Sequence, residues 1–235
     1  MGGNMILLNK KKLKLEDLKT IDDIKNAKNL NKNISAKDKR NVKILFLDDE
    51  GFDTELLINL GYLDVQKMYE YKQMDEFEKY DIIFCDINGV AKNLNEEFQG
   101  AALAKMIKQT YPDKIVVIFS AKQQYLSFNK FADFVDDVIY KNIPISELTE
   151  KIDHYINIII NPVDFWENIK KQLYKSGVNS KEISLIENYY VKSILERKDY
   201  QKEIKEIALD TKLEAFTAIV NSLGKVISLY LSFKQ

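Results

Sequence analysis

The chain has 235 residues, of which 46% are hydrophobic and 30% are charged, and this balance excludes a mostly disordered protein. Its single Cys excludes a disulfide framework and a Cys-based zinc site, and its single His excludes a multi-histidine metal site. The apolar N-terminus is too short for a signal peptide, and no apolar stretch reaches the roughly 20 residues that span a bilayer. We therefore expect a cytoplasmic protein without a membrane segment.

Charge is distributed unevenly along the chain. Residues 1–41 carry 11 Lys/Arg and 5 Asp/Glu, residues 42–142 carry 11 and 18, and residues 143–235 carry 13 and 13. A DNA-binding effector normally presents a basic face, so the neutral C-terminal third argues against DNA binding. In the basic leader, apolar residues recur every third position over 15–24, which favours one amphipathic helix, and residues 29–39 are typical of a solvated connector.

Five short apolar runs predict five β-strands. They cover residues 42–47, 63–65, 81–85, 114–119 and 137–140. Helical patterns lie between them, for example over 54–60 and 101–107, and a short polar helix ends at Phe77. Strands that alternate with helices favour parallel pairing with helices on both faces of the sheet. The sequence therefore predicts an α/β domain built on a doubly wound, five-stranded parallel sheet.

After Pro144 the chain shows helical patterns only. A helix is expected over 145–159, and later helix boundaries are marked by Asn161-Pro162, Gly177, and possible capping boxes at Asn179/Glu182 and Thr211/Glu214. These signals predict an all-α C-terminal module of three or four helices. We thus expect three parts: a basic, partly helical extension over 1–41, the sheet domain over 42–160, and a helical output or interaction module over 161–235.

Polar residues follow the predicted strands at the edge where doubly wound sheets bind ligands, which lies beyond the strands' C-terminal ends. Three converging carboxylates repel one another unless a cation lies among them, and Mg²⁺ with oxygen ligands suits this need. A lysine and a hydroxyl on the adjacent strands suit an anion with three oxygens. This combination is typical of an acyl-phosphate site. The strand-end residues are Asp48-Asp49-Glu50, Asp86 with Asn88 and Gly89 beyond it, Ser120-Ala121, and Lys141.

This set resembles the receiver domain of two-component response regulators. That family has an acidic pair after strand one, a phosphoacceptor aspartate after strand three, Ser or Thr followed by Ala after strand four, and Lys after strand five. All of these positions are present in order across residues 42 to about 155. The resemblance implies a flavodoxin-like sheet with strand order 2-1-3-4-5. It also implies a non-enzymatic signalling protein that takes its phosphoryl group from a histidine kinase or a phosphotransfer protein.

The same resemblance implies a role for each matching residue. Asp86 accepts the phosphoryl group, Ser120 bonds a phosphoryl oxygen, and Lys141 pairs with its charge. Mg²⁺ is the implied cofactor, and its ligands would be Asp48, Asp49, Asp86 and the backbone carbonyl of Asn88.

Three features depart from the family pattern. Asn142 stands where the family usually has proline, Val138 stands where it has an aromatic residue, and the loop after Asp86 runs 13 residues to Gly100. They predict a remodelled pocket rim and an output that does not use the usual hydroxyl–aromatic switch. The long amphipathic helices of the C-terminal module, above all 211–232, suit homodimerisation or docking on a protein partner.

Two alternatives remain open. The segment Asp86-Ile-Asn-Gly-Val90 also resembles the first motif of haloacid-dehalogenase-like phosphatases, with Asp86 as nucleophile and Ser120 and Asp136-Asp137 in later motifs. Against this phosphohydrolase, Asn88 cannot donate and recover a proton as a general acid does, and Asp48-Asp49 have no role in it. The other alternative is a receiver-shaped interaction protein without phosphotransfer.

Overall fold

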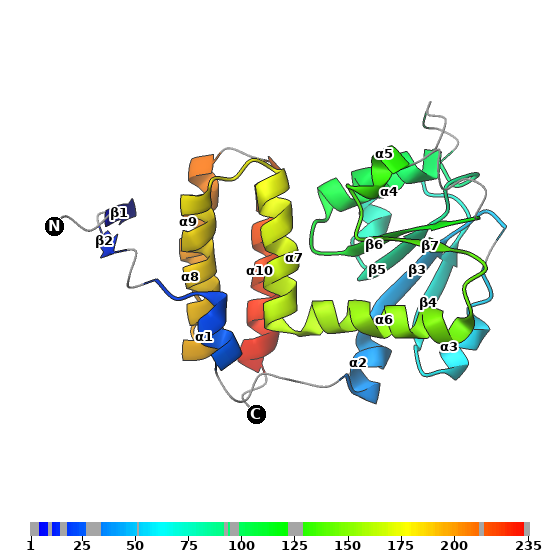
Figure 1. Ribbon diagram of the computed structural model, residues 1–235, viewed down its shortest axis with the longest axis horizontal. Helices are drawn as coiled ribbons and strands as arrows, with labels where there is room; N and C mark the ends of the chain where they lie inside the picture. Colours follow the sequence, from blue (N-terminus) through cyan, green and yellow to red (C-terminus); the bar gives the residue numbers. More distant parts are fainter. Residues whose placement is uncertain are drawn as a thin grey trace. The chain divides into compact units, whose positions relative to one another are not determined.

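The computed structural model describes residues 5–8, 11–14, 18–26, 34–50, 52–91, 94, 99–121, 129–211 and 214–232. The chain divides into two compact units (Figure 1). The sheet unit comprises residues 33–160, and the helical unit combines residues 1–32 with residues 161–235. Within the described ranges, no helix is both long and apolar enough to cross a membrane.

The sheet unit is built on a five-stranded parallel sheet (Figure 1). Its strands are β3 (Lys43–Leu47), β4 (Asp64–Met68), β5 (Ile82–Cys85), β6 (Ile115–Ser120) and β7 (Asp137–Tyr140). They lie in the order β4-β3-β5-β6-β7, which is 2-1-3-4-5 when counted within this sheet, so the predicted fold class is confirmed. Every residue of β5 and β6 is buried, as continuous apolar runs in a sheet covered on both faces require.

Helices cover both faces of this sheet. They are α3 (Glu55–Asn59), a 3₁₀ helix over Met74–Phe77, α4 (Gln99–Thr110), α5 (Asn129–Ala132) and α6 (Ile145–Ile160). Two separate apolar clusters result. One contains Leu103 and Ile107 of α4, and the other contains Leu57 of α3 with Ile152 and Ile156 of α6. Alternate residues of each strand point into one cluster or the other, so the sheet forms the middle layer of the unit.

A polar group joins α6 to the start of β7. One Asp137 carboxylate oxygen, Oδ2, accepts hydrogen bonds from the Tyr155 hydroxyl at 2.6 Å and from Lys151 Nζ at 2.8 Å. Its Oδ1 accepts from the backbone N–H of Val138 at 2.7 Å. Burial opposes the charge of Asp137, but these hydrogen bonds outweigh it and lower its pKa below the usual value. The charged form of Asp137 therefore stabilises the folded sheet unit.

Replacing Asp137 with Asn is expected to lower the free energy of unfolding by about 1 kcal/mol at pH 7, after allowance for partial exposure. The folded-state pKa of Asp137 lies below its unfolded value, so its contribution is present above the unfolded pKa and is lost as pH falls through the folded one. The difference between wild type and Asp137→Asn should therefore shrink in acid. Urea titrations of both proteins at several pH values measure this, and a pH-independent difference would contradict it.

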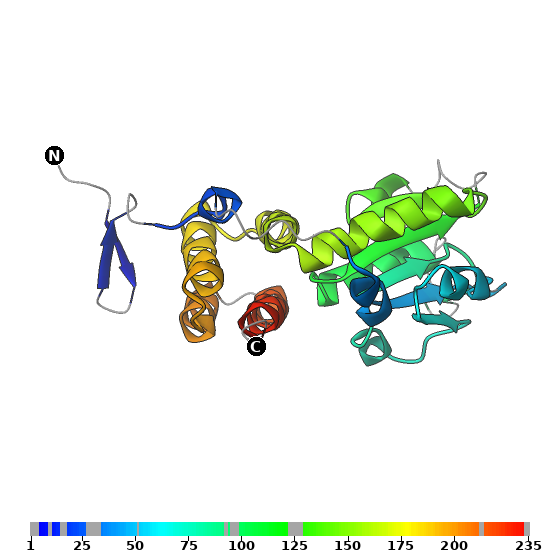
Figure 2. The ribbon, with the colours of Figure 1, turned by 90° about the horizontal axis from the view of Figure 1, so that it is seen from below.

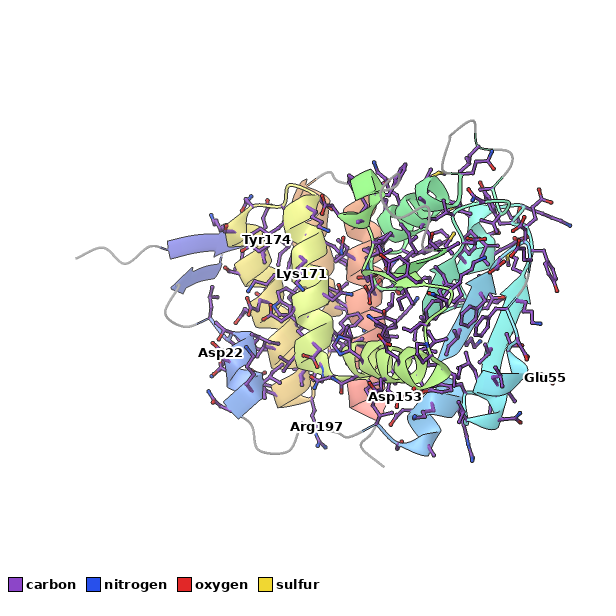
Figure 3. The ribbon with its side chains drawn as sticks, turned by 45° about the vertical axis from the view of Figure 1, so that its right-hand side comes forward. Asp22, Glu55, Asp153, Lys171, Tyr174 and Arg197 are labelled. Atoms are coloured by element: carbon purple, nitrogen blue, oxygen red, sulfur yellow. The ribbon has the colours of Figure 1, made fainter. Side chains whose placement is uncertain are left out.

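The N-terminal connector differs from the expectation of a solvated segment. Residues Ala36–Asn41 form helix α2, which opens with a capping box between Ser35 and Asp38. Lys39 Nζ lies 2.7 Å from Asp153 Oδ2 on α6, and the Tyr62 hydroxyl donates to Asp153 Oδ1 at 2.6 Å. Asp153 is labelled in Figure 3. Helix α2 thus packs on α6 as part of the sheet unit.

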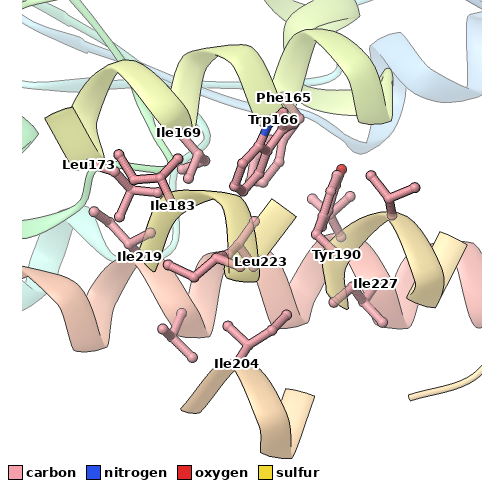
Figure 4. Packing of buried hydrophobic residues seen from close by; sticks show 14 of the residues in the cluster. Phe165, Trp166, Ile169, Leu173, Ile183, Tyr190, Ile204, Ile219, Leu223 and Ile227 are labelled. Atoms are coloured by element: carbon pink, nitrogen blue, oxygen red, sulfur yellow. The ribbon is translucent and has the colours of Figure 1, made fainter. Parts of the chain in front are cut away.

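The helical unit contains α7 (Pro162–Lys175), α8 (Ser180–Glu196), α9 (Gln201–Thr211) and α10 (Glu214–Ser232), and Figure 2 views several of its helices end-on. The predicted caps at Asn161 and Asn179 are confirmed, since both side chains accept backbone N–H groups of the first helical turn. Thr211 is the last residue of α9, and residues 212–213 lie outside the described part, so the third predicted cap is not described. Figure 4 shows the core, in which Trp166 stacks on Tyr190 at 5.4 Å between ring centroids.

The N-terminal helix α1 (Ile21–Asn26) packs on α7 and α8. Ile21 and Ile24 are buried in the core of the helical unit, and the backbone N–H of Ile21 donates to the buried Glu187 Oε1 at 2.9 Å. The helix expected over 15–24 begins only at Ile21, because residues 18–20 are described and are not helical. An antiparallel pair, β1 (Met5–Leu8) and β2 (Lys11–Lys14), precedes it. The two ends of the chain therefore build one core, and the sheet unit is inserted between them in sequence.

Candidate functional site

Three carboxylates meet at the C-terminal edge of the sheet. Asp48 directly follows β3 and Asp86 directly follows β5, and both are buried, while Asp49 is exposed. Each offers one oxygen atom, and these three oxygens all lie within 4.8 Å of one another. The parallel pairing of β3 with β5 produces this convergence, because Leu47 and Cys85 are register partners and the residues after them emerge side by side.

Lys141 reaches the same cluster from the end of β7. Its Nζ lies 2.9 Å from Asp48 Oδ2 and 2.8 Å from Asp86 Oδ2. Its backbone N–H donates to the carbonyl of Ser120 at 2.8 Å, which ties the start of the Lys141 turn to the end of β6. Among the described side chains, the three carboxylates and the one ammonium carry a formal net charge of −2.

Burial and charge act on this group in opposite directions. Burial raises the pKa of Asp86 above its usual value, the nearby Asp48 charge adds to the rise, and the ion pair with Lys141 offsets only part of it. Burial also opposes the charge of Lys141, but its hydrogen bonds to Asp86 and Asp48 outweigh burial and raise its pKa. The ammonium is therefore held in its charged form against a carboxylate whose charge is costly.

Backbone amides fix the remaining carboxylate oxygens of the two buried aspartates. The N–H of Ile87 donates to Asp86 Oδ1 at 2.7 Å, and the N–H of Glu50 donates to Asp48 Oδ1 at 3.0 Å. Each carboxylate thus has one oxygen held by the backbone and the other by Lys141. This arrangement orients both groups before any ligand arrives.

The other two predicted site residues lie at the neighbouring strand ends. Ser120 is the last residue of β6, is fully buried, and donates its hydroxyl to the carbonyl of Ala121 at 3.0 Å. Asn88 is exposed on the loop that follows Asp86. The structure therefore brings Asp48, Asp49, Asp86 and Lys141 into one cluster. It places Ser120 and Asn88 at the same sheet edge without direct bonds to that cluster among the described contacts.

Two glycines that the sequence did not single out as functional shape the loop around Asp86. Gly100, in the first turn of α4, donates its N–H to the carbonyl of Ile87 at 2.8 Å, and a Cβ there would overlap the Asp86 carbonyl oxygen. The thiol of Cys85 donates to the Gly100 carbonyl at 3.2 Å. Gly89 has a positive φ of 77° and lies against the Asp49 carboxylate. The sequence shows both glycines, but only the folded loop shows which groups approach them.

The chemistry of the donor set fits a hard divalent cation. Carboxylate oxygens are the ligands that Mg²⁺ prefers, and three of them are already within reach of one ion. The formal net charge of −2 on the described side chains of the cluster favours binding of a divalent cation. Lys141 pairs with one oxygen each of Asp48 and Asp86, so these two carboxylates would serve both the ammonium and a bound cation.

Comparison with known proteins finds similarity in solved structures alone. No protein-family model matches the chain, and no curated protein matches it. One matching structure is the response regulator TrrA of Thermotoga maritima in complex with Mg²⁺-BeF, at 22% identity and a TM-score of 0.39. The match covers 48% of this chain and 98% of that one.

Two further matches are of the same kind. A CheY-like receiver domain protein of Methanospirillum hungatei matches at 19% identity and a TM-score of 0.37, covering 49% of this chain and 94% of that one. A Burkholderia pseudomallei response regulator with a phosphorylated aspartic acid and a calcium ion matches at 15% identity and a TM-score of 0.37, covering 61% and 89%. All three matched structures are less than 25% identical to this chain, and the matches cover 48–61% of it.

Proposed function

We propose that the chain is a response regulator whose Asp86 accepts a phosphoryl group from a phosphohistidine of a histidine kinase or phosphotransfer protein. The carrying observation is the position of Lys141, whose ammonium bridges Asp48 and Asp86 inside a three-carboxylate cluster. This combination provides an acceptor oxygen, a cation for the incoming phosphoryl oxygens, and ligands for a metal ion. We place the reaction in the cytoplasm.

Each residue of the proposed site has its own role in the phosphoryl transfer. One carboxylate oxygen of Asp86 attacks phosphorus, a P–O bond forms, the P–N bond to imidazole breaks, and the imidazole nitrogen keeps the electron pair and takes up a proton. Lys141 pairs with the charge of the phosphoryl group, and the Ser120 hydroxyl bonds one of its oxygens. The backbone N–H of Ile87 keeps the Asp86 carboxylate oriented during the attack.

Mg²⁺ would be held by Asp48, Asp49 and Asp86 with the backbone carbonyl of Asn88. When bound, it supplies positive charge that offsets repulsion between the carboxylates and the approaching anion. The described side chains of the cluster carry a formal net charge of −2, which favours binding of a cation.

The helical unit is proposed as the output part of the chain. A phosphoryl group adds about −1.5 to −2 charges to Asp86, which shifts the balance between conformations of the surrounding loops. Transfer of this change to the helical unit would alter homodimerisation or the binding of a protein partner.

The position of two aspartates counts against the phosphohydrolase. Asp137 is the first residue of β7, so Asp136 and Asp137 lie at the opposite end of this strand from Lys141 and the cluster. Asp136 pairs with the buried Lys108 at 2.8 Å, and Asp137 binds Tyr155 and Lys151. Both residues have structural partners away from Asp86.

The test is the intact mass of the full chain after incubation with acetyl phosphate, with and without Mg²⁺. Wild type is expected to gain one phosphoryl group in a Mg²⁺-dependent way, and Asp86→Asn is expected to gain none. Asp53→Asn removes an exposed carboxylate four residues after Asp49 that is not part of the cluster, and this matched control should be phosphorylated like wild type.

Other outcomes have distinct meanings. Steady phosphate release from many phosphoesters without an adduct would favour the phosphohydrolase. Absence of both an adduct and turnover would leave a receiver-shaped interaction protein. Size-exclusion chromatography of the phosphorylated chain tests the output, because dimerisation predicts a shift in mass that Asp86→Asn does not show.

A further inference from the structure

Gly89 makes an unusually close approach to the exposed carboxylate of the cluster. It lies three residues after Asp86 with φ of 77°, a backbone conformation that L side chains rarely adopt. A Cβ built on Gly89 would overlap the carboxyl group of Asp49, both its oxygens and its carbon. The Asp49 carboxylate therefore occupies the space that any side chain at position 89 would need.

A clash between a side chain at position 89 and Asp49 would cost the fold little but would disturb the cation site. The atoms that Gly89 approaches belong to the free end of an exposed side chain, so Asp49 can rotate away at little cost to the fold. The loop itself is anchored by its next residues, Val90 and Ala91, which are buried in the α4-side core. A side chain at position 89 would thus move Asp49, and the left-handed backbone at this position adds strain that the buried Val90 and Ala91 help the loop to withstand.

Displacement of Asp49 would remove one of the three carboxylates and halve the formal net charge of the cluster from −2 to −1. Without its carboxylate, Asp48 and Asp86 remain, and both are already paired with Lys141. The ligands left for a cation would then be Asp48, Asp86 and the Asn88 carbonyl, and both carboxylates are also paired with Lys141. Such a site is expected to bind a divalent cation more weakly than the cluster of three carboxylates does.

We propose that Gly89 is a positioning residue for the cation site, which acts by leaving room for the Asp49 carboxylate beside Asp48 and Asp86. This inference rests on the proposed function, because it concerns the cation which that function requires. Gly89 touches no reacting atom and acts through the Asp49 carboxylate, and the proposed Asn88 carbonyl ligand belongs to the peptide bond that precedes it.

Calorimetric titration of the ion-free full chain with Mg²⁺ tests the role of Gly89. Gly89→Ala is expected to weaken Mg²⁺ binding by about 10- to 100-fold, the usual loss when a metal ligand is no longer held in place. Gly61→Ala is the matched control, because Gly61 also has a positive φ, of 99°, but nothing lies within 4 Å of its added Cβ. Both variants carry backbone strain, and the control should bind Mg²⁺ like wild type.

A double-mutant cycle separates this role from a general effect on the loop. Asp49→Ala should weaken Mg²⁺ binding by itself, and adding Gly89→Ala to it should weaken binding no further. Gly89→Asn provides a second substitution that tolerates the left-handed backbone yet still carries a Cβ, and it should bind as weakly as Gly89→Ala. Circular dichroism without Mg²⁺ verifies that each variant is folded.

Two results would overturn the inference in different ways. Equal Mg²⁺ affinity of wild type, Gly89→Ala and Gly89→Asn would show that Asp49 is not positioned by Gly89, while leaving the proposed function intact. Lack of Mg²⁺ binding by wild type would remove the cation site itself and, with it, both the inference and the Mg²⁺-dependent phosphoacceptor.

Discussion

Replacing Trp166 with alanine is expected to lower the free energy of unfolding of the helical unit by about 3–5 kcal/mol. Trp166 is fully buried, and its ring stacks on Tyr190 of α8, so the substitution leaves a cavity between α7 and α8 (Figure 4). The isoleucines and leucines of this core cluster lie on five helices, α1 and α7 to α10, and cannot all collapse into this space. Guanidinium unfolding followed by circular dichroism at 222 nm measures the change.

The matched control is Tyr174→Ala on the same helix. Tyr174 is 51% exposed, and it is labelled in Figure 3. Loss of its side chain should change the free energy of unfolding by no more than about 0.5 kcal/mol. The same unfolding transition in Trp166→Ala and Tyr174→Ala would show that the α7–α8 packing does not limit the stability of the helical unit.

The second large effect is expected at Lys108, an almost fully buried lysine of α4. Its Nζ lies 2.8 Å from Asp136 Oδ2 and donates to the carbonyls of Pro112 at 3.1 Å and Lys114 at 2.7 Å. Lys108→Ala would remove the ammonium from a largely buried carboxylate, which keeps only the backbone N–H of Val116 among the described donors, and would take one donor from each of two carbonyls. Breaking a buried ion pair from one side costs about 3–5 kcal/mol, and we expect a loss of this size in the sheet unit.

Two further variants show whether the charge of Asp136 causes that loss. Adding Asp136→Asn to Lys108→Met removes both charges, and the double variant should recover a large part of the stability that either single variant loses. Lys105→Ala, one turn earlier on α4, removes a lysine whose ammonium lies over the ring of Phe134, and should cost under 1 kcal/mol. Additive losses in the double variant would contradict an effect through the buried pair.

The sheet was predictable because its signals are local. The β-branched run around Val116 and Val117 has few alternatives to a buried strand, and the helix starts at Asn161 and Asn179 are coded by residues within one turn. Helix α2 had a similar local signal in the Ser35–Asp38 capping box, but the surrounding lysines favoured a solvated interpretation.

The packing of α1 was not predictable in this way. Its partner Glu187 lies 166 residues further along the chain, and no local pattern connects them. The roles of α2 and α1 both depend on tertiary contacts, Lys39 with Asp153 in one case and Ile21 with Glu187 in the other.

In the candidate site, too, some features could be predicted from local sequence signals and others depend on tertiary contacts. Strand order places the ends of β3, β5 and β7 at one edge, which is why Asp48, Asp86 and Lys141 could be named from sequence. The contact between Gly89 and Asp49 depends on how the loop folds back, and a positive φ is not visible in the letters Asn-Gly-Val. The residue types of the site could therefore be predicted, but the spatial fit that holds Asp49 could not.

The insertion of the sheet unit between two parts of one helical core has a consequence during synthesis. The ribosome delivers the chain from its N-terminus, so residues 33–160 are complete and free to fold before α7 emerges. Ile21 and Ile24 leave the ribosome first, yet they find their core only after α8 has been made. A chain that stops early would thus carry a finished sheet unit together with the apolar side chains of Ile21 and Ile24, whose core has not yet been made.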